Sequence, residues 1–281
     1  MWNTAQWRIN RMDNVSIWAI VDAAAEPDIF TMLDTLDPPH TCLYAEPVTD
    51  EILGVAPFLI LATPDVLAWL KVRRPPWGIL LESSAGMVTL RQHLRKYLHV
   101  LLPGEKTPVY FRFYDPRNIW PLISVLSPWE LHSFLGPINA ITTHWQGEER
   151  REHFTELRKS FHDQSGSRRK MLQISQEQLD KLTDMFDQRY VETLVDKINS
   201  WSESEPANTE ATGEICHWLK QQGIDDERSI VGLFRLFHER RYMTLATLPP
   251  EYRTALNDPN EPGVFKAESL LLREMGYLPQ V

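Results

Sequence analysis

The chain has 281 residues, 43% of them hydrophobic and 24% charged, which is the composition of a folded protein and excludes an intrinsically disordered one. Its net charge of −9 argues against a nucleic-acid-binding protein. The longest apolar run, residues 52–62, is too short to span a bilayer, and the first 14 residues lack the apolar core of a secretory signal. Cys42 and Cys216 show neither metal-ligand spacing nor a disulfide framework, so we expect a cytoplasmic protein.

The first half of the chain alternates short apolar runs with segments of helical period. We expect strands at 16–23, 41–46, 57–63, 78–83 and 109–115, with a weaker one at 139–145. Helices are expected between them at 27–36, 64–72, 87–101, 116–126 and 128–135. This alternation is typical of an α/β fold, and we predict a mixed, mostly parallel sheet flanked by helices.

Several of these helices have clear start signals. Thr63-Pro64, Asp115-Pro116 and Ser127-Pro128 each place a side-chain acceptor at the N-cap and proline at the first helical position. Ser127 and Glu130 also have the spacing of a capping box. Asp115 therefore has a structural role as a cap, and no catalytic role is needed to explain it.

After about residue 146 the sequence becomes charged and helical, with no convincing strand. One apolar stripe runs from Leu179 to Trp201 along a long helix. The polar stretch 202–213 is typical of an exposed linker, and helices are expected at 211–222, 226–241 and 265–275. We predict an α/β domain over residues 1–146 and an all-helical C-terminal lobe over 147–281.

A metal-dependent hydrolase or phosphotransferase is the alternative to a binding protein. Asp22, Ser83 and Asp115 each end a predicted strand, and ligands bind near such ends in open α/β sheets. However, the sequence has no glycine-rich phosphate loop, no G-x-S-x-G elbow and no H-E-x-x-H helix. We therefore predict no catalytic residue, no cofactor and no metal ligand.

Arg112 is the charged residue of the aromatic run at 109–115. Strand alternation places its side chain on one face with Tyr110 and Tyr114, where a desolvated guanidinium requires a carboxylate. Asp22 and Glu82 are the candidate partners, and a buried structural pair is favoured over substrate binding. His93, at the edge of the apolar face of its helix, is also expected to be structural rather than catalytic.

Two apolar segments are candidate contact surfaces for another protein. Leu233, Phe234 and Phe237 belong to a helix that is more apolar than one stripe requires, so it is either internal or a docking surface. Trp69, with Arg73 and Arg74 of the basic segment that follows it, is the second candidate patch, with core packing as the alternative.

Four stretches together resemble one protein family over residues 17–138. They are WAIVDAAAEPDIF, APFLILATPDVLAWL, the long block from WGILLESS through the HLR triplet to FRFYDPRNI, and LHSFLGPI. In this order they resemble the N-terminal domain of the bacterial type VI secretion effector chaperones, also called adaptors. The motif residues of this sequence, which we expect to be structural, are Asp22, His93, Arg95, Arg112, Asp115 and Pro116. Alanine follows Asp22 where a glycine is common in the family.

The resemblance implies a non-enzymatic cytosolic protein that holds a toxic effector before export. It implies that the protein helps to load the effector onto a VgrG-type spike, often through the effector's PAAR-like or adjacent N-terminal region. It implies no nucleic-acid or membrane partner. Residues 147–281 carry no motif of the family. We expect this helical lobe to select the cargo, because its long amphipathic helix and its Phe-rich helix offer the apolar surface that such selection needs.

Overall fold

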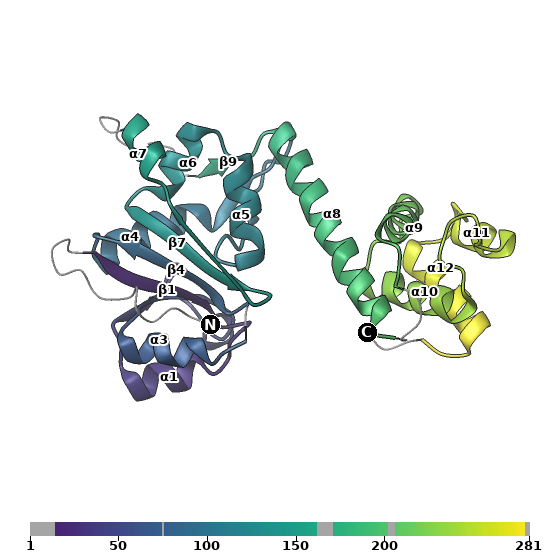
Figure 1. Ribbon diagram of the computed structural model, residues 1–281, viewed down its shortest axis with the longest axis horizontal. Helices are drawn as coiled ribbons and strands as arrows, with labels where there is room; N and C mark the ends of the chain where they lie inside the picture. Colours follow the sequence, from purple (N-terminus) through teal and green to yellow (C-terminus); the bar gives the residue numbers. More distant parts are fainter. Residues whose placement is uncertain (1–14, 75, 162–170, 202–205, 279–281) are drawn as a thin grey trace. The chain divides into compact units, whose positions relative to one another are not determined.

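The chain folds into two compact units, Met1–Leu182 and Thr183–Val281. The computed structural model describes residues 15–74, 76–161, 171–201 and 206–278 (Figure 1). Each unit has its own hydrophobic core. The units divide later in the chain than the change of composition at residue 146.

The first unit is built on a six-stranded sheet with the order β2-β3-β1-β4-β7-β8. Every pairing in this sheet is antiparallel. Its strands are β1 (Ser16–Asp22), β2 (His40–Cys42), β3 (Pro57–Leu61), β4 (Gly78–Ser83), β7 (Ile138–Trp145) and β8 (Glu148–His153).

The predicted mostly parallel sheet is therefore wrong. β3 and β4 run in the same direction and are joined through a helix, as in a parallel α/β unit, but β1 lies between them and pairs antiparallel with both. The sequence pattern shows that these strands are apolar on both faces, and it does not show which strands are neighbours.

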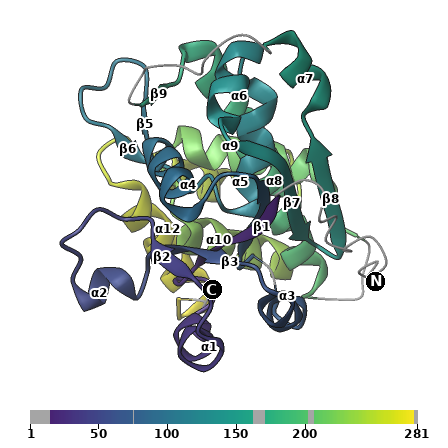
Figure 2. The same ribbon diagram turned by 90° about the vertical axis from the view of Figure 1, so that its left-hand side faces the viewer.

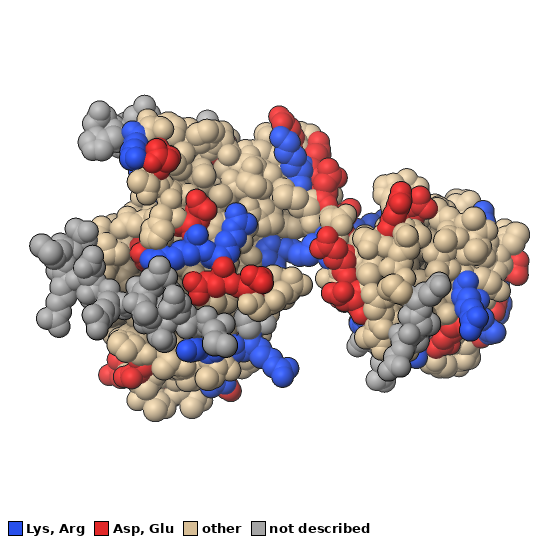
Figure 3. Space-filling view, in the orientation of Figure 1, with Lys and Arg blue, Asp and Glu red and all other residues tan. Residues whose placement is uncertain are grey.

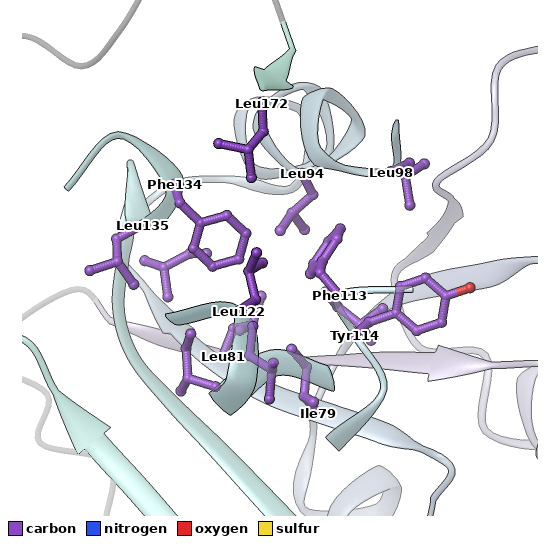
Figure 4. Packing of buried hydrophobic residues seen from close by; sticks show 14 of the residues in the cluster. Ile79, Leu81, Leu94, Leu98, Phe113, Tyr114, Leu122, Phe134, Leu135 and Leu172 are labelled. Carbon is purple, nitrogen blue, oxygen red and sulfur yellow. The ribbon is translucent and has the colours of Figure 1, made fainter. Parts of the chain in front are cut away.

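Helices cover both faces of the sheet, which explains why its central strands are apolar throughout. α1 (Ile29–Leu36) and α3 (Pro64–Lys71) lie on one side, and α4 (Met87–Leu94), α5 (Pro116–Val125) and α6 (Pro128–Leu135) on the other (Figure 2). Along β1, Ala19 and Val21 point toward α1 and α3. Trp18 and Ile20 point toward the opposite face, which α4, α5 and α6 cover. Figure 4 shows the core between the sheet and α4, α5 and α6, in which Phe113 and Phe134 pack near Leu122.

A second, three-stranded mixed sheet has the order β6-β5-β9. It consists of β5 (His99–Leu101), β6 (Val109–Tyr110) and β9 (Leu172–Gln173). The predicted helix 87–101 therefore ends early, at α4 and a short 3₁₀ turn, η1 (Arg95–Tyr97), before β5 begins. The predicted strand 109–115 ends at Tyr110, because the chain turns there and buries two consecutive aromatics, Phe113 and Tyr114.

Four short elements of the first unit were not predicted from the sequence. They are β8, β9, α2 (Asp50–Leu53) and α7 (Thr155–Ser160). The prediction that no strand follows residue 146 is therefore wrong. β8 is a charged edge strand, and in Figure 3 basic and acidic side chains lie next to one another on the visible face of this unit. Charges along an edge strand disfavour pairing with another chain.

In the second unit all the elements that the structure describes are helices. α8 (Gln176–Asn199) begins in the first unit and ends in the second. It is followed by α9 (Thr209–Gln221), α10 (Glu227–Arg240), α11 (Pro250–Leu256) and α12 (Gly263–Met275). Residues 202–205 of the expected linker lie outside the described residues. Within the described part of the chain, no helix has the length and hydropathy needed to cross a bilayer.

Candidate partner-binding site

The buried carboxylate of Asp22 ends β1 and pairs with Arg112. Its Oδ1 accepts a hydrogen bond from the backbone N–H of Ala24 at 3.1 Å, and its Oδ2 lies 3.4 Å from Nη1 of Arg112. This confirms the predicted pair. The Arg112 side chain is 49% exposed, however, so its predicted burial between two tyrosines is wrong. The other candidate partner, Glu82, pairs with Arg151.

Asp115 caps α5, as the sequence predicts. Its Oδ1 accepts a hydrogen bond from the backbone N–H of Arg117 at 2.8 Å, and Pro116 occupies the first turn. The Arg117 guanidinium also binds the same carboxylate, with Nη2 2.6 Å from Oδ2. The Asp115 carboxylate is thus already occupied by a helix cap and an ion pair.

His93 and Gly136 connect two of the family-like stretches. His93 Nε2 lies 2.7 Å from the carbonyl oxygen of Phe134, and burial lowers the pKa of the imidazole to about 4, so the ring is neutral and donates this hydrogen bond. Gly136 has φ +46°, and a Cβ there would lie 2.1 Å from Cε1 of His93. Only glycine fits beneath this ring, which explains the pairing of the HLR and LGPI stretches.

The structure brings together two of the three residues of the alternative enzyme site and leaves out the third. Asp22 lies close enough to Asp115 for the charge of Asp115 to help raise the pKa of Asp22, whereas Ser83 lies elsewhere. The register pairs Ser16 with Ser83 and Val21 with Gly78, which places Asp22 and Ser83 at opposite ends of the β1–β4 pair. Ser83 Oγ donates to the carbonyl of Pro137 at 2.7 Å and accepts from the N–H of Ala85 at 3.0 Å. Among the residues described, no group of three His, Cys, Asp or Glu side chains is arranged to hold a metal ion.

Trp69 and the basic segment after it form a small patch on α3. The Arg73 guanidinium lies 4.3 Å from the centre of the Trp69 ring, and its Nη1 is 2.7 Å from Oδ2 of Asp28. Arg74 is exposed, whereas Trp77 is buried in the core beneath the sheet. Trp69 is partly buried and packs against the core of the first unit, as the core-packing alternative expects, and Arg73 already has both an aromatic and an acidic partner.

The three apolar residues predicted on α10 are not at the surface. Leu233, Phe234 and Phe237 are fully buried in the core of the helical unit. α10 is covered by its neighbours on most of its circumference, including α12, which explains its excess of apolar residues. Of the two interpretations given for this helix, the internal one is correct, and the docking surface predicted at these residues is wrong.

An exposed apolar face is found instead on α12, where the sequence predicts none. Phe265 is 61% exposed, Leu272 51% and Val264 42%, while Ala267, Leu270 and Leu271 point into the core. Phe265 and Leu272 are seven residues apart, the spacing of one helical face. The signal in the sequence was the apolar content of α12, which exceeds what its one buried stripe uses.

Comparison with protein families gives a match within the first unit. Residues 17–133 match the family model described as a domain of unknown function, DUF4123. The match lies in the first unit, spans less than half of the chain and includes all six motif residues from Asp22 to Pro116. No curated protein and no solved structure matches the chain.

Proposed function

We propose that this chain is a cytosolic chaperone or adaptor that binds a type VI secretion effector and helps to load it onto a VgrG-type spike. The observation that supports the proposal most strongly is that the family match and the chaperone-like stretches cover nearly the same residues. The DUF4123 match covers residues 17–133, and the stretches that resemble the effector chaperones lie within residues 17–138. The PAAR-like or N-terminal region of the effector is the proposed contact.

The roles of the motif residues support a binding protein rather than an enzyme. Asp115 caps a helix, His93 donates to a backbone carbonyl, and Asp22 pairs with Arg112. Each of these groups is used by the fold itself. We do not carry the metal-dependent hydrolase forward, because Asp22 and Ser83 lie at opposite ends of their strands.

We assign selection of the cargo to the helical unit and the common framework to the first unit. The family match ends before the helical unit begins. Within that unit, the face of α12 formed by Val264, Phe265 and Leu272 offers exposed apolar area, which is what the centre of a protein interface requires.

The test is affinity capture of the tagged full-length chain from the bacterium that encodes it, followed by identification of bound proteins. We expect one bound protein that the type VI system also secretes. The double variant Phe265→Glu/Leu272→Glu should lose most of this protein, because two charges on an apolar contact face oppose its desolvation. Val88→Glu, at a site 70% exposed on α4, is the matched control and should retain it.

Two results would count against this proposal. Capture of no secreted protein by the wild-type chain would contradict the chaperone function itself. Capture by the folded double variant at the wild-type level would contradict the assignment to α12 and leave the function in place. Circular dichroism and thermal unfolding of each variant establish that it is folded.

A further inference from the structure

A cavity of the first unit lies between the segment that follows β2 and the η1–β5–β6 region. Its volume is about 330 Å³. Leu43 and Leu98 are buried at its base, and Ile52 and Tyr110 are exposed at its rim. This is the lower end of the range of roughly 300–1,000 Å³ for small-molecule sites, so it suits one or two side chains better than a cofactor.

The walls of this cavity are held in place by neighbouring contacts. Arg91 donates from Nε to the carbonyl of Cys42 at 2.7 Å and from Nη2 to the carbonyl of Tyr44 at 3.0 Å, which fixes the segment after β2 to α4. The rings of Tyr44 and Tyr110 meet edge to face at 5.7 Å, and the Tyr110 hydroxyl lies 2.9 Å from that of Tyr114. The cavity is therefore preformed.

Arg95 is the guanidinium that lines this cavity. It belongs to the HLR stretch, and among the described residues it forms neither a hydrogen bond nor an ion pair. Arg91, one helical turn before it, is by contrast fully engaged. No acidic side chain is found among the described residues that line the cavity. An unpaired guanidinium in a mostly apolar cavity is complementary to a carboxylate beside an apolar group.

We propose that this cavity receives an extended segment of the bound protein, which inserts an apolar side chain while an adjacent Asp or Glu pairs with Arg95. The proposal rests on the proposed function, because the occupant is the effector that the chain carries. We commit to an acidic residue within the segment. A chain-end carboxylate is usually captured by clustered backbone N–H groups, whereas the charged group supplied here is a side-chain guanidinium.

The test is an NMR titration of the isotope-labelled full-length chain with capped tetrapeptides. The probes are Ac-Ala-Leu-Asp-Ala-NH₂, its Asn counterpart, and the Asn peptide with a free C-terminal carboxylate. We expect the Asp peptide to bind about tenfold more tightly than the capped Asn peptide, since one hydrogen-bonded charge is worth about that factor. Resonances of residues around the cavity should shift.

Substitutions of the charged residue and of one apolar residue of the cavity test the assignment further. Arg95→Gln should reduce binding of the Asp peptide to the level of the Asn peptide, and Ile52→Ser should weaken both. Arg228→Gln is the matched control, because Arg228 is exposed, does not line the cavity and belongs to neither candidate contact surface. It should leave all three affinities unchanged.

The comparison of peptides on the wild-type chain decides the question even where a variant is unstable. Equal affinity for the Asp and Asn peptides, or the absence of saturable shifts around the cavity, would overturn the proposal. Tighter binding of the free-carboxylate peptide would overturn the assignment to an internal acidic residue. If these titrations fail while a secreted protein is still captured, the cavity proposal is wrong and the chaperone proposal stands.

Discussion

At the residue scale, His93 has its charge suppressed by the fold. The unfolded chain binds a proton on this imidazole below the ordinary pKa of 6.5, whereas the folded chain does so only below about 4. Between these values the unfolded state holds more protons, so the free energy of unfolding falls as the pH is lowered through this window. The contribution of His93 is fully present above pH 6.5.

We predict that His93→Gln removes this part of the pH dependence. Glutamine keeps a donor for the carbonyl of Phe134 and does not titrate. The loss of stability between pH 6.5 and 4 should be smaller in the variant by up to about 3 kcal/mol, from about 1.4 kcal/mol per pKa unit. Urea unfolding at several pH values measures it, and parallel curves for the two proteins would contradict the account.

Asp22 predicts a pH dependence of the opposite sign. Burial raises the pKa of its carboxyl, so the folded state binds the proton more readily than the unfolded state, and the free energy of unfolding falls as the pH rises through this window. Asp22→Asn avoids the charge and keeps an acceptor for the N–H of Ala24. Relative to wild type, the variant should therefore be more stable at pH 7 than at pH 4.

The size of this difference is limited by the partner of Asp22. Arg112 is half exposed, so losing the ion pair costs only about 0–1 kcal/mol. Chemical unfolding of both proteins at the two pH values provides the comparison. A variant whose relative stability declines toward neutral pH would mean that the ion pair outweighs the desolvation of Asp22.

The residue-level predictions succeeded where a local pattern determines the contact. The Asp115-Pro116 pair specifies a cap within four residues, and the structure confirms it. The exposure of Arg112 was not predictable in this way, because the prediction needed the strand to continue past Tyr110. Whether the chain continues as a strand or turns after Tyr110 depends on the hydrophobic core into which Phe113 and Tyr114 pack. Segments distant in the sequence form that core.

At the element scale, two glycines within helices predict opposite effects of the same substitution. A Cβ at Gly263, at the start of α12, would lie 1.8 Å from the backbone oxygen of Gly223. A Cβ at Gly213, within α9, would meet only Val191, at 3.8 Å. The first site is a close approach of two backbones, and the second has ordinary space.

We predict that Gly263→Ala destabilises the protein by about 1–3 kcal/mol, because a backbone must move to admit the methyl group. Gly213→Ala should stabilise it by up to about 1 kcal/mol, since alanine is the better helix former. Thermal unfolding of both variants is the measurement. Stabilisation by both substitutions would show that the contact between α12 and Gly223 is not as close as described.

The long apolar elements were predictable from the sequence, and the edge elements were not. The main helices have one buried face that gives the sequence a helical period, and β1, β3, β4 and β7 are buried on both faces and form continuous apolar runs. β8 has almost no buried side chain, and β6 and β9 are two residues long. Such strands form because an adjacent strand supplies backbone hydrogen-bond partners. The local sequence contains no pattern that indicates this pairing.

At the scale of the whole molecule, the sequence predicted an α/β part followed by a helical part but not the direction of the strands. Strand direction matters for function, because the alternative enzyme site assumed that Asp22 and Ser83 meet at one edge. In the antiparallel sheet they lie at opposite ends. The exposed face of α12 was missed for a related reason, since burial of α10 within the unit determines which apolar residues remain outside.

The central claim is that the chain serves the export of a particular effector. The most direct measurement compares the proteins released by the bacterium that encodes this chain with those released after its gene is deleted, under conditions in which the type VI system is active. The account predicts that one effector disappears from the released proteins while the structural components of the secretion tube remain. A released set that is unchanged by the deletion would contradict it.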